Sequence, residues 1–572
     1  MQSLIKKYSN LGKANSTPNL RYLISFLPNA SFSTINLTLQ QEIIYLCGKG
    51  KENLKQGKIE EAINTFNDTL LRVMNSRNDT LLLVDEIYKN LGRAHCKLGR
   101  TTEALDCLIQ SLNVAIKVYG KNHRFIACLY RELGSVYEKQ EKYDEAIICL
   151  KRAIEICNSI DLGNHSKVAK LHLKIADLYE KLGLYDESIE SLHKGLQILQ
   201  WYHEETDSKI QKIYLYLAKN YEKAGNLESS RLYYEKLIQI NKNFMALIPI
   251  YNNLGEVCKQ QGRYSESITY YSKAIDLCQR NNYVENIMAM VTLYTNLGSL
   301  YEFLGKTDQA LQNYFHALSL TSKKGHVSPS HISGLYNNIG NVYFSMGSIE
   351  EALNYYHQAI TAIPEKNSNL LIKPNYNLGT TYIYKEDFPQ AISFLEEASR
   401  ISNIYYGKNH KESAVILNMI GYAYRKNMNI TKGEGLMMES IQILEGFSKT
   451  TSELINCYYM IGTFYLETND CNKSLEFLKR ALEILTSHYG ENHPHALAIY
   501  KNLSWASLRK QLYSDAIFYQ TKVINCQTSL SGESDPKLGL EYGTLAALYE
   551  EAGDFKKAEE YYQVSTSILN TN

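Results

Sequence analysis

Residues 294–317 read YTNLGSLYEFLGKTDQALQNYFHA, and a related pattern recurs thirteen times along the 572-residue chain, mostly at intervals of 42 residues. Within this stretch the small residues Gly298 and Ala310 stand twelve positions apart, and Gly305 lies between them. Self-similarity at a fixed period is the signature of a repeat array in which each unit stacks on its neighbours. The pattern therefore predicts an all-α solenoid of about thirteen helix pairs.

Each predicted pair carries one small residue in its first helix and a second one twelve positions later, in its second helix. Two helices approach to about 8–10 Å only where the side chains at the crossing are short. The two positions are therefore expected to mark the crossing point of each pair. They are Gly50/Ala62, Gly92/Ala104, Gly134/Ala146, Ala176/Ser188, Ala218/Ser230, Gly255/Ser267, Gly298/Ala310, Gly340/Ala352, Gly379/Ala391, Gly421/Gly433, Gly462/Ser474, Ser504/Ala516 and Ala546/Ala558.

Three further positions repeat with the small pairs. A tyrosine three residues after the first small residue, such as Tyr343, is expected to fill the space that the small residue leaves open. Glycines between the two helices, such as Gly347, are expected to adopt the left-handed conformation that follows many helix ends. A third small residue, such as Ala359, is expected to seat the second helix against the next repeat.

Over roughly residues 43–569 this pattern resembles the tetratricopeptide repeat. Three joints between units, Tyr119-Gly-Lys-Asn-His123, Tyr406-Gly-Lys-Asn-His410 and Tyr489-Gly-Glu-Asn-His-Pro494, are similar to those of the kinesin-light-chain repeat subtype. The resemblance implies a right-handed superhelical solenoid whose first helices line a concave groove. It also implies a scaffold or adaptor that binds protein segments, with cytoskeletal, motor-cargo or ciliary roles as candidates. Regulation of a bound signalling protein or enzyme is the alternative.

The composition excludes several other classes. With 61 basic and 60 acidic residues, the chain lacks the basic excess expected of a nucleic-acid-binding protein. The sequence contains no run of about 18 apolar residues, so it predicts no membrane span. The eleven cysteines form no CxxC pair. The motifs HExxH and GxSxG, the P-loop and a dinucleotide fingerprint are all missing from the sequence, so we expect no enzyme, cofactor or metal site. His488, His493 and His495 are interpreted as joint residues.

Uneven spacing suggests internal boundaries. The interval shrinks to 37 residues after Ala218 and to 39 after Gly340, and Pro249 and Pro374 are expected at the start of the first helices that follow. We therefore expect repeats 1–5 over residues 41–243, repeats 6–8 over 244–364 and repeats 9–13 over 365–572. Residues 1–40 contain no acidic residue and are expected to be a flexible lead-in or a targeting segment.

The candidate binding residues are asparagines two positions before the first small residue. In tetratricopeptide arrays this position points into the groove, and families that hold peptides there use asparagine, so the resemblance gives these side chains a peptide-binding role. An amide both donates and accepts hydrogen bonds, as a peptide main chain requires. The alternative is that each amide bonds only within its own helix or to solvent. The candidates are Asn90, Asn253, Asn296, Asn338, Asn377 and Asn502, with Asn337 and Asn341 beside them.

Basic residues flank the same face in the earlier repeats. Lys89, Arg93, Lys174 and Lys219 would suit an acidic or carboxylate-terminated segment, although charges on helices usually form only a solvated face. The expected partners are thus extended peptides or helices, with self-association through the C-terminal edge as a further candidate. A cytoplasmic location, associated with the cytoskeleton or a cilium, is expected, and a mitochondrial one is the minor alternative.

Overall fold

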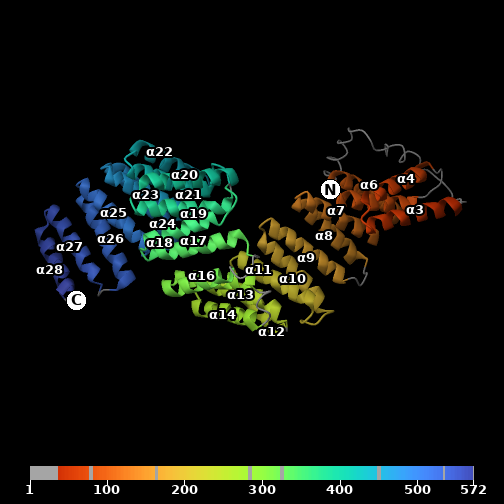
Figure 1. Ribbon diagram of the computed structural model, residues 1–572, viewed down its shortest axis with the longest axis horizontal. Coiled ribbons are helices and arrows are strands. Elements are labelled where there is room, and N and C mark those ends of the chain that lie inside the picture. Colours follow the sequence, from red (N-terminus) through yellow and green to blue (C-terminus); the bar gives the residue numbers. More distant parts are fainter. Residues whose placement is uncertain are drawn as a thin grey trace. The chain divides into compact units, whose positions relative to one another are not determined.

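The computed structural model describes residues 37–75, 81–160, 165–241, 243–280, 287–321, 327–366, 368–447, 452–532 and 535–570. Within these ranges the chain forms twenty-six α-helices and one short 3-10 helix, and no strand (Figure 1). The helices form thirteen pairs, which confirms the predicted all-α repeat architecture. Nearly all of the predicted lead-in, residues 1–40, lies outside the described residues.

By its internal contacts the chain divides into a first unit, Met1–Tyr270, and a second unit, Tyr271–Asn572. This division falls inside one helix, and the boundaries expected at residues 244 and 365 stay predictions. The helices of the first unit, each second helix following its first, are α3 (Leu37–Lys55), α4 (Ile59–Asn75), α5 (Leu81–Lys97), α6 (Thr101–Tyr119), α7 (Arg124–Lys139), α8 (Tyr143–Ser159), α9 (His165–Lys181), α10 (Tyr185–Gln200), α11 (Ser208–Lys223), α12 (Leu227–Ile240), α13 (Phe244–Gln260) and the start of α14 (Tyr264–Arg280).

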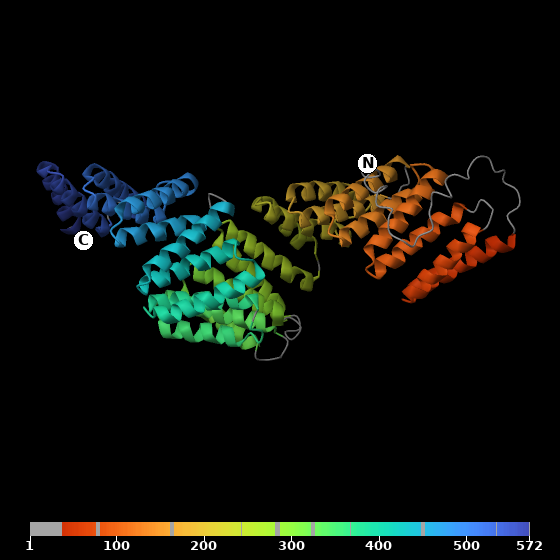
Figure 2. The same cartoon turned by 90° about the horizontal axis from the view of Figure 1, so that it is seen from above.

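The second unit continues the same alternation of first and second helices, seen from a second direction in Figure 2. Its helices after α14 are α15 (Ile287–Phe303), α16 (Thr307–Thr321), α17 (Pro329–Ser345), α18 (Ile349–Thr361), η1 (Asn369–Leu371), α19 (Ile372–Tyr384), α20 (Phe388–Tyr405), α21 (Lys411–Lys426), α22 (Ile430–Phe447), α23 (Ser452–Glu467), α24 (Cys471–Tyr489), α25 (Pro494–Arg509), α26 (Tyr513–Ser531), α27 (Pro536–Glu551) and α28 (Phe555–Asn570).

The small residues lie at the crossing of each pair, as predicted. Ser267 Oγ donates a hydrogen bond of 2.6 Å to the Gly255 carbonyl oxygen, and Ser188 makes the same bond to Ala176 at 2.9 Å. A Cβ atom added at Gly340 would lie 2.6 Å from the Tyr356 ring. Short side chains are therefore required at these positions because the helices pack at close range.

The predicted role of the tyrosine after the small residue is wrong. The space over the first small residue is filled by the side chain sixteen positions later, for example by Tyr356 over Gly340. Tyr343 instead stacks on Tyr355 of the second helix, with ring centroids 5.3 Å apart and an interplanar angle of 4°. The same parallel stack joins Tyr221/Tyr233, Tyr382/Phe394, Tyr465/Phe477 and Tyr549/Tyr561.

The third small residue meets the next repeat as predicted, for example through Ser440 Oγ, which lies 3.6 Å from Cys457 Sγ of α23, but it has a second contact as well. It contacts the first helix of its own repeat, twenty-six residues earlier, and thereby marks a second crossing within the pair. Ser111 Oγ donates to the Asp85 carbonyl oxygen at 2.6 Å, and Ser440 donates to that of Ala414 at 2.6 Å. In the repeat of Ala359, Ser333 Oγ bonds the Ala359 carbonyl oxygen across the same crossing.

All thirteen turns between paired helices use a left-handed residue. The glycines predicted for this role, such as Gly347 with φ 78°, adopt it in eight repeats. In the other five repeats the same position holds a residue with a side chain. These are Glu141, Glu386, Met428, Asn469 and Gln511, with φ between 59° and 65°. The repeat geometry imposes this conformation even where the residue type disfavours it.

The two prolines differ in position. Pro374 is the third residue of α19, close to the predicted helix start. Pro249 lies inside α13, because this helix already begins at Phe244. The prediction for Pro249 is therefore wrong by more than one turn, and the helix continues without the hydrogen bond that proline cannot donate.

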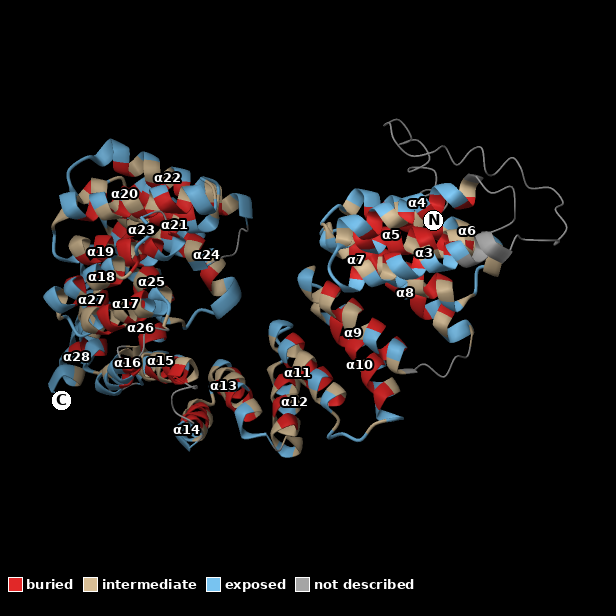
Figure 3. Cartoon of the chain, turned by 45° about the vertical axis from the view of Figure 1, so that its right-hand side comes forward, coloured by how far each residue is buried: buried red, intermediate tan, exposed pale blue. Residues whose placement is uncertain are grey.

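Burial follows the helix contacts within each unit (Figure 3). Alternating buried and exposed stripes are what amphipathic helices in a layered fold require. Among the large exposed side chains are both tryptophans of the chain. Trp201, in the joint after α10, is 80% exposed, and Trp505, in α25, is 51% exposed. Each unit thus carries one tryptophan.

Candidate functional site

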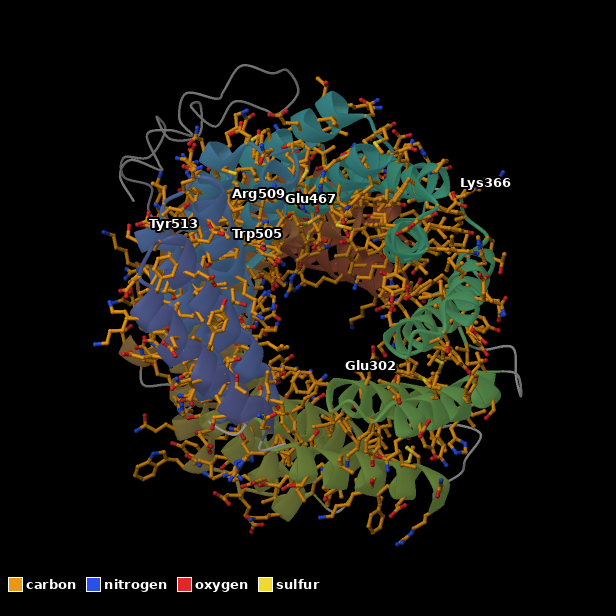
Figure 4. The ribbon with its side chains drawn as sticks, turned by 90° about the vertical axis from the view of Figure 1, so that its left-hand side faces the viewer. Glu302, Lys366, Glu467, Trp505, Arg509 and Tyr513 are labelled. Atoms are coloured by element: carbon orange, nitrogen blue, oxygen red, sulfur yellow. The ribbon has the colours of Figure 1, made fainter. Side chains whose placement is uncertain are left out.

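Residues close in sequence to the first small residue make the contacts between successive first helices. We call the side of each first helix that carries these contacts the first-helix face. In the second unit it lies on the inside of the curve that the helices describe. Figure 4 shows Glu302 of α15 on this inner side and Lys366, in the joint before η1, on the outer side. Side chains on this face can reach both a neighbouring repeat and a bound partner.

In the first unit, lysines tie successive first helices together, and we call this set the lysine ladder. Each lysine stands five residues after its first small residue and reaches the C-terminal end of the preceding first helix. Lys97 and Lys139 Nζ donate to the carbonyl oxygens of Leu54 and Cys96 at 3.1 and 2.8 Å. Lys181 and Lys223 bond Glu138 and Glu180 at 2.8 and 2.6 Å. A cation at the end of a helix also interacts favourably with the helix dipole.

The basic residues proposed from the sequence lie on this face, and three of the four contact neighbouring helices. The Arg93 guanidinium bonds Glu132 at 2.7 Å. Lys174 bonds Ser135 at 2.6 Å and Glu138 at 3.1 Å. Burial works in the opposite direction, yet the paired cations hold the pKa of Glu132 and of Glu138 below the usual range.

Among the residues that the structure describes, Lys89 and Lys219 form no hydrogen bond with a neighbouring helix. The Lys89 ammonium lies 4.3 Å from the centroid of the Phe125 ring, and burial lowers its pKa. Lys219, on α11, is exposed. A role of these residues toward an acidic segment stays a prediction.

The asparagines differ in their exposure. Asn90 is only 3% exposed, and its Nδ2 atom has no hydrogen-bond partner among the described residues. Its burial departs from the expected position in an open groove. The others are partly exposed on the first-helix face. They are Asn253, Asn296, Asn338, Asn377 and Asn502.

Three of the candidate amides form one network across two repeats, which we call the amide network. Asn377 of α19 donates from Nδ2 to Oδ1 of Asn337 at 2.9 Å and to Oδ1 of Asn341 at 3.0 Å, both on α17. The hydroxyl of Tyr356, on α18, donates to the same Asn341 oxygen at 2.9 Å. The structure therefore brings together residues that the sequence placed side by side only as a pattern.

Sequence reasoning missed the buried tyrosines beneath this face. In repeats 5 to 8 the position four residues after the second small residue is tyrosine, and each ring is at most 2% exposed. The Tyr314 hydroxyl bonds Glu302 at 2.7 Å, and that of Tyr356 bonds Asn341. The four are Tyr234, Tyr271, Tyr314 and Tyr356. The sequence does contain a signal for them, because this position changes from phenylalanine or leucine in repeats 1 to 4 to tyrosine in repeats 5 to 8.

Aromatic side chains lie on the same face, toward the C-terminal ends of α15, α17 and α19. Phe303 and Tyr384 occupy equivalent positions, five residues after the small residue, and each is 67% exposed. Phe344 meets Tyr384 edge to face, with ring centroids 5.7 Å apart. We call Phe303, Phe344 and Tyr384 the aromatic row. Large apolar side chains exposed beside polar ones commonly mark an interaction site.

Other candidate sites are simpler. His493 caps α25, because its Nδ1 atom accepts a hydrogen bond from the His495 amide at 3.2 Å. No group of three metal-ligating side chains occurs within the described ranges. In the same ranges no helix is both long and apolar enough to cross a membrane. At the C-terminal end, a shallow open pocket is lined by residues of α28, among them Phe555 and Tyr562, and self-association there stays a prediction.

Two sequence profiles described as tetratricopeptide repeat match this chain. One matches residues 83–159, 247–323, 331–404 and 453–529, which together make up more than half of the 572 residues. The other matches residues 169–198 and 211–244. The matched segments cover first and second helices in both units.

The curated relatives are distant and much longer. The "Clustered mitochondria protein homolog" of Debaryomyces hansenii is 23% identical over 210 residues, which cover 35% of this chain and 15% of the relative. The protein of the same name from Xenopus tropicalis is 22% identical over 192 residues, which cover 32% of this chain and 14% of the relative. This chain thus matches only a small part of their length. Among solved structures, TPR-like repeats assigned to a kinesin light chain of Podosopora anserina are 16% identical and cover 36% of this chain and 98% of their own, with a TM-score of 0.33.

Proposed function

Because this chain belongs to the tetratricopeptide repeat family, we propose that it is an adaptor that holds an extended segment of a partner protein against the first-helix face of α15, α17 and α19. The fold is generally a protein-interaction scaffold without enzymatic activity of its own. Tetratricopeptide repeat proteins bind protein partners, so a polypeptide ligand is the expected class. The role is binding and assembly.

One observation supports the proposal: the aromatic row and the partly exposed asparagines Asn296, Asn338 and Asn377 lie on the first-helix face of the same three helices, α15, α17 and α19. Phe303 and Tyr384 expose two thirds of their surface, and Asn338 and Asn377 are partly exposed. Amides can bond a main chain of any sequence, while exposed aromatic rings favour apolar side chains along one edge of it. Together they suit an extended segment with one apolar edge.

The first unit offers a separate candidate surface for an acidic protein segment. Its first-helix face carries Lys170, Lys212 and Lys219, which are exposed and form no ion pair within the described residues. Acidic side chains of a partner would be attracted to these lysines, chiefly during association and at low salt.

A peptide selection tests the proposal. A random 12-residue display library is selected on the whole chain, and the dissociation constant of each recovered peptide is measured by calorimetry. We expect Phe303→Ala with Tyr384→Ala, and separately Asn338→Ala, to weaken binding at least about tenfold, which corresponds to about 1.4 kcal/mol. Phe555→Ala is the matched control, because Phe555 is 69% exposed but lies on α28. Equal effects of the control and the site variants would refute this location.

The partner proteins are then identified in cells by proximity labelling. The wild-type chain is compared with the Phe303→Ala, Tyr384→Ala double variant. Proteins labelled only by the wild type are the partners that require the aromatic row. We expect cytoskeletal, motor-cargo or ciliary proteins among them. Mitochondrial proteins form the second set to score, since the matched relatives carry the name clustered mitochondria protein homolog. Identical labelling by both chains would contradict the proposal.

A further inference from the structure

In the amide network each hydrogen bond has a defined donor and acceptor, and we call this order the hydrogen-bonding sense of the network. Asn377 Nδ2 carries two hydrogens, and both are used, one for Asn337 Oδ1 and one for Asn341 Oδ1. Its own Oδ1 atom keeps its acceptor capacity. Asn341 is the reverse case, since its Oδ1 accepts two hydrogen bonds while its Nδ2 donates none within the described residues.

Tyr356 holds this sense in place. Its ring is 2% exposed and is wedged under Gly340, where an added Cβ would lie 2.6 Å from it. The phenol can therefore not turn away, and burial raises its pKa, so it remains a hydrogen-bond donor at neutral pH. In this arrangement the phenol donates to the Asn341 oxygen, and an Asn341 amide that flipped alone would face the Asn377 Nδ2 with its own Nδ2 and lose that hydrogen bond.

A similar contact occurs elsewhere, but with a different outcome. The buried Tyr234 hydroxyl bonds both Asn253 and Glu222, so a carboxylate shares that phenol. In repeat 9 the position of Tyr356 is taken by Leu395, and Asn377 bonds the preceding repeat instead. Among the described residues, the α17–α19 network links three amides and one phenol, which also meets the buried Thr381 hydroxyl, and its hydrogen bonds involve no charged side chain.

We infer that Tyr356 is a positioning residue that makes Asn341 a pure donor and Asn377 a pure acceptor toward the ligand, so that this site takes a polypeptide main chain in one hydrogen-bonding sense. A carbonyl oxygen of the partner then faces α17, and an amide N–H faces α19. A phosphate-bearing strand offers acceptors but no donor for Asn377, and a free cation offers no acceptor for Asn341. This inference rests on the proposed function, because it specifies what the same face recognises.

The network itself is tested first, without a ligand. The whole chain is deuterated and labelled with ¹⁵N-asparagine, and the side-chain amide signals are assigned by single substitutions. Tyr356→Phe removes only the hydroxyl. We expect the Asn341 signal to shift and its amide protons to exchange several-fold faster with solvent, while Asn338, on the same helix outside the network, stays unchanged. An unchanged Asn341 signal, or equal changes at Asn338, would overturn the inference.

The ligand sense is tested with a peptide recovered from the display library. Each peptide bond is replaced in turn by an ester, which removes one N–H donor and keeps the carbonyl. One ester position should weaken binding to the wild type about tenfold, as expected for a hydrogen bond of about 1–1.5 kcal/mol, and should cost almost nothing in Asn377→Ala. An ester penalty that is the same in both chains would overturn the assignment of Asn377 as the acceptor.

The two proposals fail in different ways. If no recovered peptide depends on Asn338 or on the aromatic row, the proposed function is wrong, although the amide signals can still report the network. If peptides bind there but Tyr356→Phe leaves both affinity and the ester pattern unchanged, only the positioning role of Tyr356 is wrong. Thermal melting of Tyr356→Phe is recorded in parallel, because a general loss of structure would weaken binding without any specific role of the hydroxyl.

Discussion

Successive first helices are joined by charged side chains in repeats 2–5 and by neutral amides in repeats 8–9. The lysine ladder joins successive helices in the first unit by charged hydrogen bonds, as in Lys181 to Glu138. The amide network joins α17 to α19 with neutral groups, as in Asn377 to Asn341. The charged groups of an ion pair use their hydrogen-bonding capacity on each other, and salt weakens their attraction. Amide ties leave half of their hydrogen-bonding capacity for a ligand, which is why the neutral region is the stronger binding candidate.

The largest effect is expected from overfilling a helix crossing in the neutral region. Gly340→Val places a branched side chain where the Cβ alone would lie 2.6 Å from the buried Tyr356 ring. We expect a loss of about 2–3 kcal/mol in unfolding free energy, typical of overpacking. Hydrogen exchange should increase first in α17 and α18. Gly435→Ala in α22 is the control, since nothing lies within 4 Å of its added Cβ, and that change should be neutral or stabilising.

Breaking the amide tie is expected to cost less. Asn377→Ala leaves the nearly buried Asn337 oxygen without its donor, so we expect a loss of about 1–2 kcal/mol. Urea denaturation at low and high salt measures it. The loss should be independent of ionic strength, because the tie is neutral. Strong salt dependence would show that charges stabilise this region as well.

Breaking a rung of the lysine ladder should cost less again. Lys181→Met keeps most of the apolar stem but removes the hydrogen bonds to Glu138 and Asp177. The side chains are partly exposed, so we expect about 0.5–1 kcal/mol at low salt. In about 1 M salt the difference from the wild type should nearly vanish. A penalty that persists at high salt would assign the effect to packing of the stem.

Acidification should produce the smallest and most selective effect. The pKa of Glu138 is lowered against the opposing effect of burial by Lys181 and Lys174, so its contribution is present above the ordinary value near 4.5 and is lost as the pH falls through the lowered one. The stability gap between the wild type and Lys181→Met should therefore be full at pH 7 and shrink below about pH 4.5. The gap for Asn377→Ala should stay constant. A Lys181→Met gap that does not shrink would contradict the ionic account.

The repeat architecture was predictable because it depends on local spacing. The small residues Gly298 and Ala310 identify a helix crossing without further information. Other features depend on partners that spacing does not name. Tyr343 was assigned to the wrong space because periodicity gives the face of a helix but not the opposing side chain. The left-handed turn at Glu141 was not expected, because glycine was the only signal used for it.

The candidate site was predictable only in part. The asparagines could be found as a row, yet the sequence does not show that Asn90 is buried or that Asn377 bonds residues 36 and 40 positions earlier. Those hydrogen bonds depend on the stacking distance between repeats, which no local pattern encodes. The lysines were read as ligand contacts, whereas Lys174 bonds the neighbouring helix. A polar residue on an exposed helix face can serve either the fold or a partner, and only the geometry separates the two.

The presence of one tryptophan in each unit gives the molecule two separate optical reporters. Trp201 and Trp505 are both largely open to water, and Arg509 lies over the Trp505 ring at 5.4 Å. In Trp505→Phe the indole emission comes from the first unit alone, and in Trp201→Phe it comes from the second. Quenching by iodide and by caesium ions can then compare the local charge around the two indoles, and the binding of an unlabelled peptide can be followed in either unit.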